Sequence, residues 1–349
     1  MKKTAWILIL ALIVGLLSGC AGTAVVYTGD CTCPTEGAST AVTQPAAEGS
    51  LKTGLAVVGN LSDSTDGKVK YDVTVAAVLV DENGMIVDCK LDSLGAEVNF
   101  DETGVITSDL TAALATKNEL GDSYGMKAYG GAKYEWYEQA AALSGYAMGK
   151  TVEELRNGAV NESGKAADAD LASTATIYLA GYVSAIEAAV NNAQFLGASA
   201  GDRLSIAVVA SLGSSTSATA EGDGVAQLDC DVTALSMNGD TITSCTIDSL
   251  QAKVSFSNAG TITADLSAPV QTKNQLGEAY GMKAWAGAKY EWNEQAASFA
   301  AYVTGKTADE VEGIAVDESA KPTDADLSAS VTISVGGFKA LVCKAARAQ

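Results

Sequence analysis

The amino-acid sequence predicts an α+β fold made of two tandem copies of an antiparallel-sheet domain packed with helices. The main observation is that the stretch from Thr116 to Ala141 returns from Thr272 to Ala297 with 20 of 26 positions identical. Each copy also holds an alternating strand pattern around an Asn-Gly pair, followed by helical patterns. The repeat period of 156 residues exceeds the roughly 20–50 residues of a solenoid unit. The duplication therefore indicates two domains, predicted at residues 51–197 (repeat 1) and 198–349 (repeat 2).

Residues 1–19 are predicted to be a secretory signal peptide. Two lysines open the chain, and an apolar run from Ile7 to Leu17 follows, which is too short for a spanning helix of about 20 residues. The run ends on Leu-Ser-Gly-Cys20, which resembles a bacterial lipobox. The resemblance implies that Cys20 carries the lipid, so that acyl chains anchor the protein at the extracytoplasmic face of the membrane. The alternative is an ordinary signal peptide with a chance cysteine.

Residues 20–50 are predicted to form a flexible tether because Thr, Ala, Gly, Ser and Pro predominate without periodicity. The tether contains Cys31 and Cys33. Such a pair could bind a metal or close a strained disulfide, but two isolated thiols make a weak metal site. The interpretation we favour gives them no function.

The charge of the chain excludes several function classes. A net charge of −20 and a pI near 4.3 argue against binding nucleic acid and against a polybasic contact with anionic lipid. The absence of histidine removes His-based triads and most zinc chemistry. We therefore predict no catalytic residue and no metal site.

Each repeat is expected to open with a strand, Leu55–Gly59 or Ile206–Ala210, and to continue into a hairpin. Alternation from Val69 to Ala77 precedes Asn83-Gly84, and Asn238-Gly239 marks the copy. A further strand pair is predicted in each repeat, at residues 96–100 with 105–108 and at residues 252–256 with 261–264.

The repeat 2 hairpin carries Cys230 and Cys245, one on each arm. Counting outward from the turn brings them almost opposite each other, so we predict a cross-strand disulfide, which an extracytoplasmic setting permits. By the same count Val73 faces Cys89 in repeat 1, so that repeat lacks the bridge. We interpret the disulfide as a local staple.

The duplicated stretch predicts a helix over residues 133–148, with Gly149 as its C-terminal stop. Trp136 and its copy Trp292 are interpreted as core anchors. The Tyr-Gly-Met triplets that begin at Tyr124 and Tyr280 could flank a planar ligand, or could simply pack the helix. Short helices are expected at residues 151–156 and 307–311, where Thr and an acid three residues later make capping boxes.

A run of small hydroxyl residues closes each repeat. It spans residues 168–176 in repeat 1 and 324–332 in repeat 2, and a helix is predicted to follow at about 177–193 and 333–346. The N-terminus of a helix is a natural seat for a phosphate. The alternative is that Thr176 and Thr332 only cap or start the last helix.

This closing run resembles the FMN-binding domain family, found in sodium-pumping quinone reductases, Rnf-type complexes and flavinylated lipoproteins. In that family the motif Asp-x-x-Ser/Thr-Gly-Ala-Thr precedes the last helix. Asp170, Ser173, Ala175 and Thr176 match it in spacing, while Thr174 stands at the glycine position. Glycine allows a tight backbone turn, for which a β-branched residue is a poor substitute.

Repeat 2 keeps only Asp326 and Thr332 of this motif. The resemblance implies that a flavin transferase esterifies FMN through its phosphate onto Thr176 and Thr332. It also implies an electron carrier, with redox partners on either side, that is not itself a catalyst. The alternative is a non-redox surface lipoprotein that keeps the scaffold without flavin. A hydrolase is disfavoured, because the acids near the motif are typical of helix starts.

Overall fold

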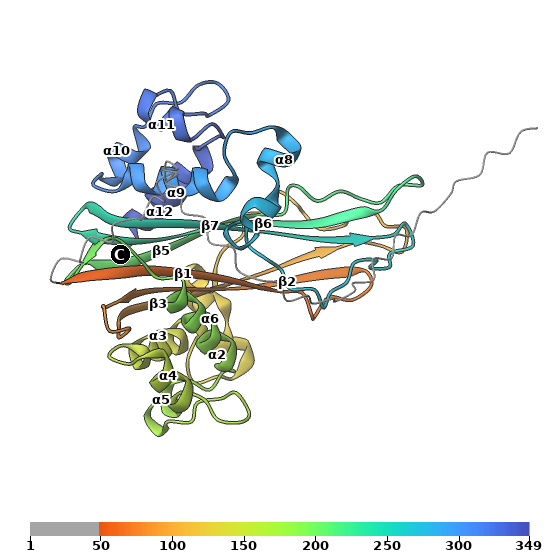
Figure 1. Cartoon of the computed structure of the whole chain (residues 1–349). Coiled ribbons are helices and arrows are strands. Elements are labelled where there is room, and N and C mark those ends of the chain that lie inside the picture. The colour runs from red at the N-terminus through yellow and green to blue at the C-terminus, as the bar shows by residue number, and fades with distance from the viewer. Residues whose placement is uncertain (1–48, 349) are drawn as a thin grey trace, which may run out of the picture. The chain divides into compact units, whose positions relative to one another are not determined.

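The computed structural model describes residues 49–348, which form four layers (Figure 1). Two antiparallel sheets pack face to face, and helices cover the outer face of each sheet. The predicted α+β class and the antiparallel sheets are confirmed. The predicted leader, Cys20, Cys31 and Cys33 lie outside the described residues.

The sheets follow the two repeats. The first sheet has the order β3-β2-β1-β4, and the second has the order β5-β6-β7. The strands of the first are β1 (Ser50–Asn60), β2 (Lys68–Val80), β3 (Ile86–Asn99) and β4 (Gln194–Ser199). The strands of the second are β5 (Arg203–Ser211), β6 (Gly224–Asn238) and β7 (Thr241–Phe256).

Both repeats contribute to the core between the sheets. The alternating residues Val69 to Ala77 of β2 face this core, as their period of two predicts. At one end Phe100 of repeat 1 stacks on Phe256 of repeat 2, with ring centroids 3.9 Å apart and planes 12° from parallel. Each sheet therefore buries the inner face of the other, and the described residues belong to one compact unit.

The hairpins form at the predicted turns. The side chain of Asp81 accepts hydrogen bonds from the backbone N–H groups of Asn83 and Met85, at 2.9 and 2.8 Å, and so closes the β2–β3 turn. The additional strand pair forms only as a bridge. Residues 96–99 belong to β3, and Phe100 pairs with Ile106 in an isolated antiparallel bridge, beside which the N–H groups of Asp101 and Thr107 donate to the Val105 and Asn99 carbonyls, at 2.9 and 2.8 Å.

The predicted disulfide between Cys230 and Cys245 is also wrong. Cys230 pairs with Leu250 and lies in the core between the sheets, whereas Cys245 pairs with Leu235 and faces the helices. Both thiols are free and buried. Residues directly opposite each other point to the same face of a sheet, so cysteines on opposite faces cannot be joined. The count for repeat 1 fails likewise, because the partner of Cys89 is Val78.

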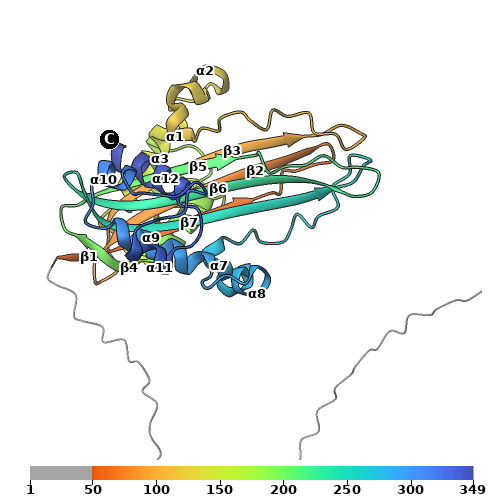
Figure 2. The same cartoon turned by 90° about the horizontal axis from the view of Figure 1, so that it is seen from above.

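The helices of each repeat cover their own sheet. Those of repeat 1 are α1 (Lys117–Leu120), η1 (Gly121–Tyr124), α2 (Met126–Gly130), α3 (Trp136–Ala147), α4 (Val152–Gly158), α5 (Ala169–Thr174) and α6 (Ala180–Asn191). Those of repeat 2 are α7 (Lys273–Leu276), η2 (Gly277–Tyr280), α8 (Met282–Ala286), α9 (Trp292–Val303), α10 (Ala308–Glu312), α11 (Ala325–Ser330) and α12 (Gly336–Arg347). Helices α3 and α6 pack on the first sheet, and α9 and α12 pack on the second. Figure 2 shows α2 and α8 projecting on opposite sides of the sheets.

The helix starts follow local capping. The predicted capping boxes at Thr151 and Thr307 are confirmed as the starts of α4 and α10. The long helix of the duplicated stretch begins at Trp136, because Glu135 and Glu138 form a capping box there. Among residues 49–348, no helix is both long and apolar enough to cross a bilayer.

Candidate functional site

The hydroxyl-rich run of repeat 1 folds into a helix of its own. Asp168 caps α5, because its carboxylate accepts hydrogen bonds from the N–H groups of Asp170 and Leu171, at 2.9 and 3.0 Å. The Ser173 hydroxyl donates to the Asp170 carbonyl at 2.7 Å. The last helix, α6, begins only at Ala180. The prediction that the run feeds directly into the last helix is therefore wrong, because Asp168 starts a separate short helix.

Thr176 is exposed and is held by a buried glutamine of α3. The Gln139 side-chain oxygen accepts hydrogen bonds from the Thr176 N–H at 2.7 Å, the Thr176 hydroxyl at 3.2 Å and the Ile177 N–H at 3.1 Å. The Gln139 amide group donates to the Tyr134 carbonyl at 3.0 Å. Thr176 therefore neither caps nor starts α6, and its N–H is not free for a phosphate. The Thr176 hydroxyl donates its hydrogen bond to Gln139, and its oxygen accepts no hydrogen bond from any described residue.

Repeat 2 reproduces this arrangement. The side-chain oxygen of Gln295 accepts hydrogen bonds from the N–H and the hydroxyl of Thr332, at 2.8 and 3.2 Å. Both threonines are exposed, as are Asp170, Ser173 and Asp326, whereas Ala175 is buried. Asp170 and Ser173 are hydrogen-bonded to each other within α5, whereas Thr176 is hydrogen-bonded to Gln139 of α3. The residues that match the FMN-binding motif therefore do not converge on one point. Nothing in the sequence singles out Gln139 and Gln295 beyond their place in the duplicated stretch.

A cavity of about 530 Å³, the aromatic pocket, lies next to Thr176 in repeat 1. Ile177 and Tyr178, the two residues that follow Thr176, line it. The other residues that line it come from β1, β2, α1, η1, α2, α3 and α6: Val58, Asn60, Asp72, Thr74, Lys117, Tyr124, Met126, Trp136, Gly181 and Tyr182. The Tyr-Gly-Met triplet and Trp136 thus contribute to a cavity.

The rings of the aromatic pocket are fixed by polar contacts. The Trp136 indole N–H donates to the Tyr182 hydroxyl at 3.0 Å, and the Lys117 ammonium lies 5.3 Å from the ring centroids of Tyr124 and Trp136. The carboxylate of Glu135, which is 1% exposed, accepts the N–H groups of Met126 and residue 127, at 2.8 and 2.9 Å. This buried carboxylate holds the turn that carries Tyr124, and the sequence pattern did not reveal it.

The N-terminus of α6 opens into the aromatic pocket. The N–H groups of Leu179 and Ala180 donate to the Gly164 carbonyl, at 2.7 and 3.1 Å. Within the described residues, the next two amides, of Gly181 and Tyr182, find no acceptor, and no side chain caps the helix. A Cβ atom at Gly181 would meet nothing within 4 Å. Free amides and open space at a 12-residue helix start favour an anion.

Repeat 2 differs at the equivalent positions. Asp231 stands where repeat 1 has Thr74, and its carboxylate lies 3.8 Å from where a Cβ on Gly337 would be, at the start of α12. Phe338 replaces Tyr182 and packs on Trp292, with ring centroids 5.6 Å apart. In repeat 2 a carboxylate of the chain itself therefore lies at the helix start.

No known protein family, curated protein or solved structure was found to match this chain. Among residues 49–348, no group of three or more Cys, Asp or Glu side chains is arranged to hold a metal ion.

Proposed function

We propose that this protein is a lipid-anchored carrier of FMN, and that the flavin is esterified to Thr176 beside the aromatic pocket. The observation that carries the proposal is the exposed Thr176 hydroxyl, which directly precedes two residues of that pocket. Thr332, held in the same way in repeat 2, is the second candidate acceptor. The carrier would work at the extracytoplasmic face, with Cys20 as the lipid-bearing residue.

The residues of the aromatic pocket suit a flavin. Its volume of about 530 Å³ lies within the range of about 300–1,000 Å³ that is typical of ligand pockets. Tyr124, Trp136 and Tyr182 provide aromatic surface for a planar ring system. The free amides of Gly181 and Tyr182 and the nearby Lys117 favour a phosphate, and the carboxylate of Asp72 opposes it. Bound FMN would supply the redox chemistry, while the protein would hold and orient it.

The chain's own residues have positioning roles in this proposal. Gln139 fixes the backbone on both sides of the Thr176 side chain, so the hydroxyl is presented at a defined point. Trp136 and Tyr182 hold each other through their hydrogen bond, which limits rearrangement of the pocket wall. Attachment of the flavin would require a separate transferase and a flavin dinucleotide as donor, because the ester to the Thr176 oxygen forms as the pyrophosphate bond of the donor breaks and a nucleoside monophosphate leaves. Electron transfer would require a donor and an acceptor.

The main test is co-expression of the full chain with a flavin transferase, followed by intact mass measurement and an absorption spectrum. We expect one FMN adduct that disappears in Thr176→Ala and persists in the matched control Thr332→Ala. Thr74→Asp, which copies the carboxylate of repeat 2, should reduce the adduct because it would place negative charge near the start of α6. An unmodified mass and a colourless protein would reject the carrier.

The second candidate function is a non-redox surface lipoprotein that keeps the scaffold. The carboxylate of Asp231 at the start of α12 and the threonine at position 174 favour it. In that case no adduct forms on either threonine. The lipid anchor is tested separately: Cys20→Ser should release the protein from the membrane fraction in either case.

A further inference from the structure

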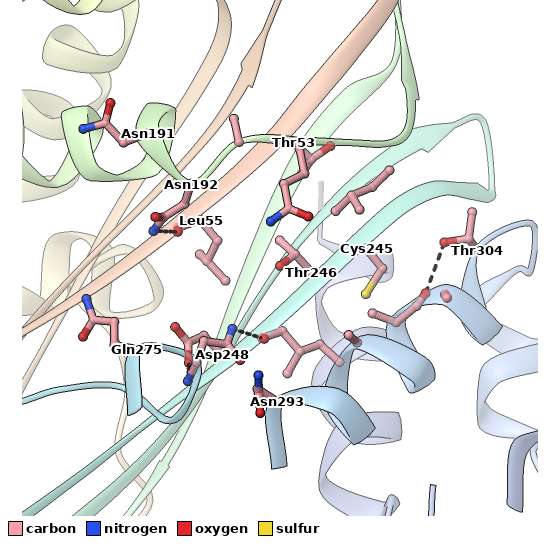
Figure 3. A pocket seen from close by; sticks show the side chains of 18 residues that line it. Thr53, Leu55, Asn191, Asn192, Cys245, Thr246, Asp248, Gln275, Asn293 and Thr304 are labelled. Carbon is pink, nitrogen blue, oxygen red and sulfur yellow. Dashed lines mark hydrogen bonds between the residues drawn. The ribbon is translucent and has the colours of Figure 1, made fainter. Parts of the chain in front are cut away.

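A second cavity lies where the two repeats meet, beside β7, which is an edge strand of the second sheet (Figure 3). We call it the amide crevice, and its volume is about 590 Å³. Repeat 1 contributes β1, the end of α6 and the start of β4 (residues 191–194 and 196), and repeat 2 contributes β7, α7 and α9. None of its residues lines the aromatic pocket.

The duplication creates an equivalent place on the other side, where α12 of repeat 2 meets α1 of repeat 1. Lys344 of α12 bridges it by donating to the Val208 carbonyl at 2.6 Å and by pairing with the Glu119 carboxylate. At the corresponding positions, 156 residues away, Ala188 of α6 stands for Lys344, and Gln275, which lines the amide crevice, stands for Glu119. Because neither of these residues is charged, no ion pair equivalent to Lys344–Glu119 can form across the amide crevice.

The amide crevice is lined with carboxamides. Asn191, Asn192, Gln275 and Asn293 surround it in Figure 3. The Asn293 side-chain oxygen is buried and accepts no hydrogen bond from any described residue. A buried oxygen without a donor costs about 1–3 kcal/mol, which a bound donor or a water would offset. Asn293 replaces Tyr137 of repeat 1, so this amide is particular to the amide crevice.

The charges of the amide crevice limit what it can bind. Neither lysine nor arginine lines it, and Asp248 is the sole ionisable carboxyl group among the residues that do. The lining therefore offers nothing to attract a phosphate or carboxylate ligand. The Asp248 carboxylate is 9% exposed and already accepts the N–H groups of Ser249 and Asn274, at 2.7 and 3.1 Å, so it offers little to a cation either. The lining also contains no aromatic ring on which a planar base or flavin could stack.

The ligand class that remains is a neutral molecule with many hydrogen-bonding groups. The side chains of Asn191, Gln194 and Asn293 make no hydrogen bond to any described residue, so each offers two N–H donors and one acceptor oxygen. By contrast, the Asn192 and Asn274 amide groups already donate to the Leu55 and Ile247 carbonyls. The Thr246 hydroxyl can both donate and accept. A lining that both donates and accepts hydrogen bonds pairs best with ligand hydroxyl groups, because a hydroxyl also donates and accepts. We propose that the amide crevice binds an uncharged polyhydroxylated molecule of the size of a mono- or disaccharide. This binding function is independent of flavin attachment.

The test is titration of the full mature chain with glucose, N-acetylglucosamine and maltose by calorimetry, with glucuronate and glucosamine as charged probes. At least one neutral sugar should bind saturably, and the charged probes should bind at least tenfold more weakly. Asn293→Leu should weaken that binding at least tenfold, whereas the matched variant Tyr137→Phe in repeat 1 should leave it unchanged. Equal affinity for a charged probe would overturn the proposed class.

A second variant protects the test against misfolding. The double substitution Ala188→Lys with Gln275→Glu copies the Lys344–Glu119 bridge into the amide crevice and should abolish sugar binding while the thermal transition is retained. Binding that persists in a folded double variant would overturn the proposal. So would the absence of saturable binding for all three neutral sugars.

Discussion

Replacing Gln139 by leucine should destabilise the protein, because this side chain joins α3 to the loop that carries Thr176. Gln139 is fully buried and makes four hydrogen bonds to nitrogen and oxygen partners, besides a 3.9 Å contact of its amide group with the Met126 sulfur. A typical hydrogen bond contributes about 0.5–1.5 kcal/mol net, so four bonds amount to roughly 2–6 kcal/mol. Thr176 is exposed, so water can replace part of what is lost there. We therefore expect a loss of about 3 kcal/mol in the free energy of unfolding.

The assay is urea unfolding followed by tryptophan fluorescence and circular dichroism. Gln295→Leu should lose a similar amount, because Gln295 makes the equivalent bonds to Thr332 and its neighbour. Gln194→Leu, at an exposed side chain, should change stability by less than about 0.5 kcal/mol. In hydrogen exchange, the amides of Thr176 and Ile177 should exchange faster in Gln139→Leu than in the wild type. A loss below about 1 kcal/mol would refute the role given to this glutamine.

Three other predictions test the core, the cysteines and a buried acid. Phe100→Ala and Phe256→Ala should each cost about 3–5 kcal/mol in urea unfolding, and because the rings stack, a double-mutant cycle should give a coupling of about 0.5–1.5 kcal/mol. Peptide mapping without reduction should place Cys230 and Cys245 in separate peptides, and a linked peptide would contradict the register of β6 and β7. Burial raises the pKa of Asp248, so the folded protein holds this proton to higher pH than the unfolded chain, whose aspartates titrate near pH 3.9. The contribution of Asp248 to the free energy of unfolding should therefore decline as pH rises above about 3.9. Asp248→Asn should remove that part of the pH dependence, and a pH dependence of the unfolding free energy equal to that of the wild type would contradict the prediction.

The strands and turns could be predicted because they depend on neighbouring residues. Alternation from Val69 to Ala77 fixes one face, and an Asn-Gly pair fixes a tight turn. The pairing of Cys230 and Cys245 could not be read by counting outward from Asn238-Gly239, because the turn closes on Asn238 and Thr241 and a register shift follows between Ser236 and Met237. Cys230 therefore lies opposite Leu250, five residues beyond Cys245. One extra residue in a strand moves every later side chain to the other face.

The candidate site was predictable only in part. The spacing from Asp168 to Thr176 drew attention to a segment that lies beside the aromatic pocket, but it suggested that Thr176 starts a helix. The hydrogen bonds that fix Thr176 come from Gln139, which is 37 residues earlier in the chain. Such a partner leaves no periodic signal, and neither does the buried Glu135 that holds the turn at Met126.

The sequence by itself determined the duplication, the hairpins, the capping boxes and the acidic, histidine-free surface. These features depend on composition or on contacts between residues only a few positions apart. Only the tertiary structure decided that the two sheets bury each other, that the two residues after Thr176 line an aromatic pocket, and that one side of the junction between repeats is bridged by Lys344 while the other is open. The physical reason is that these features arise from contacts between residues distant in the chain, whose free energy depends on how the two repeats pack.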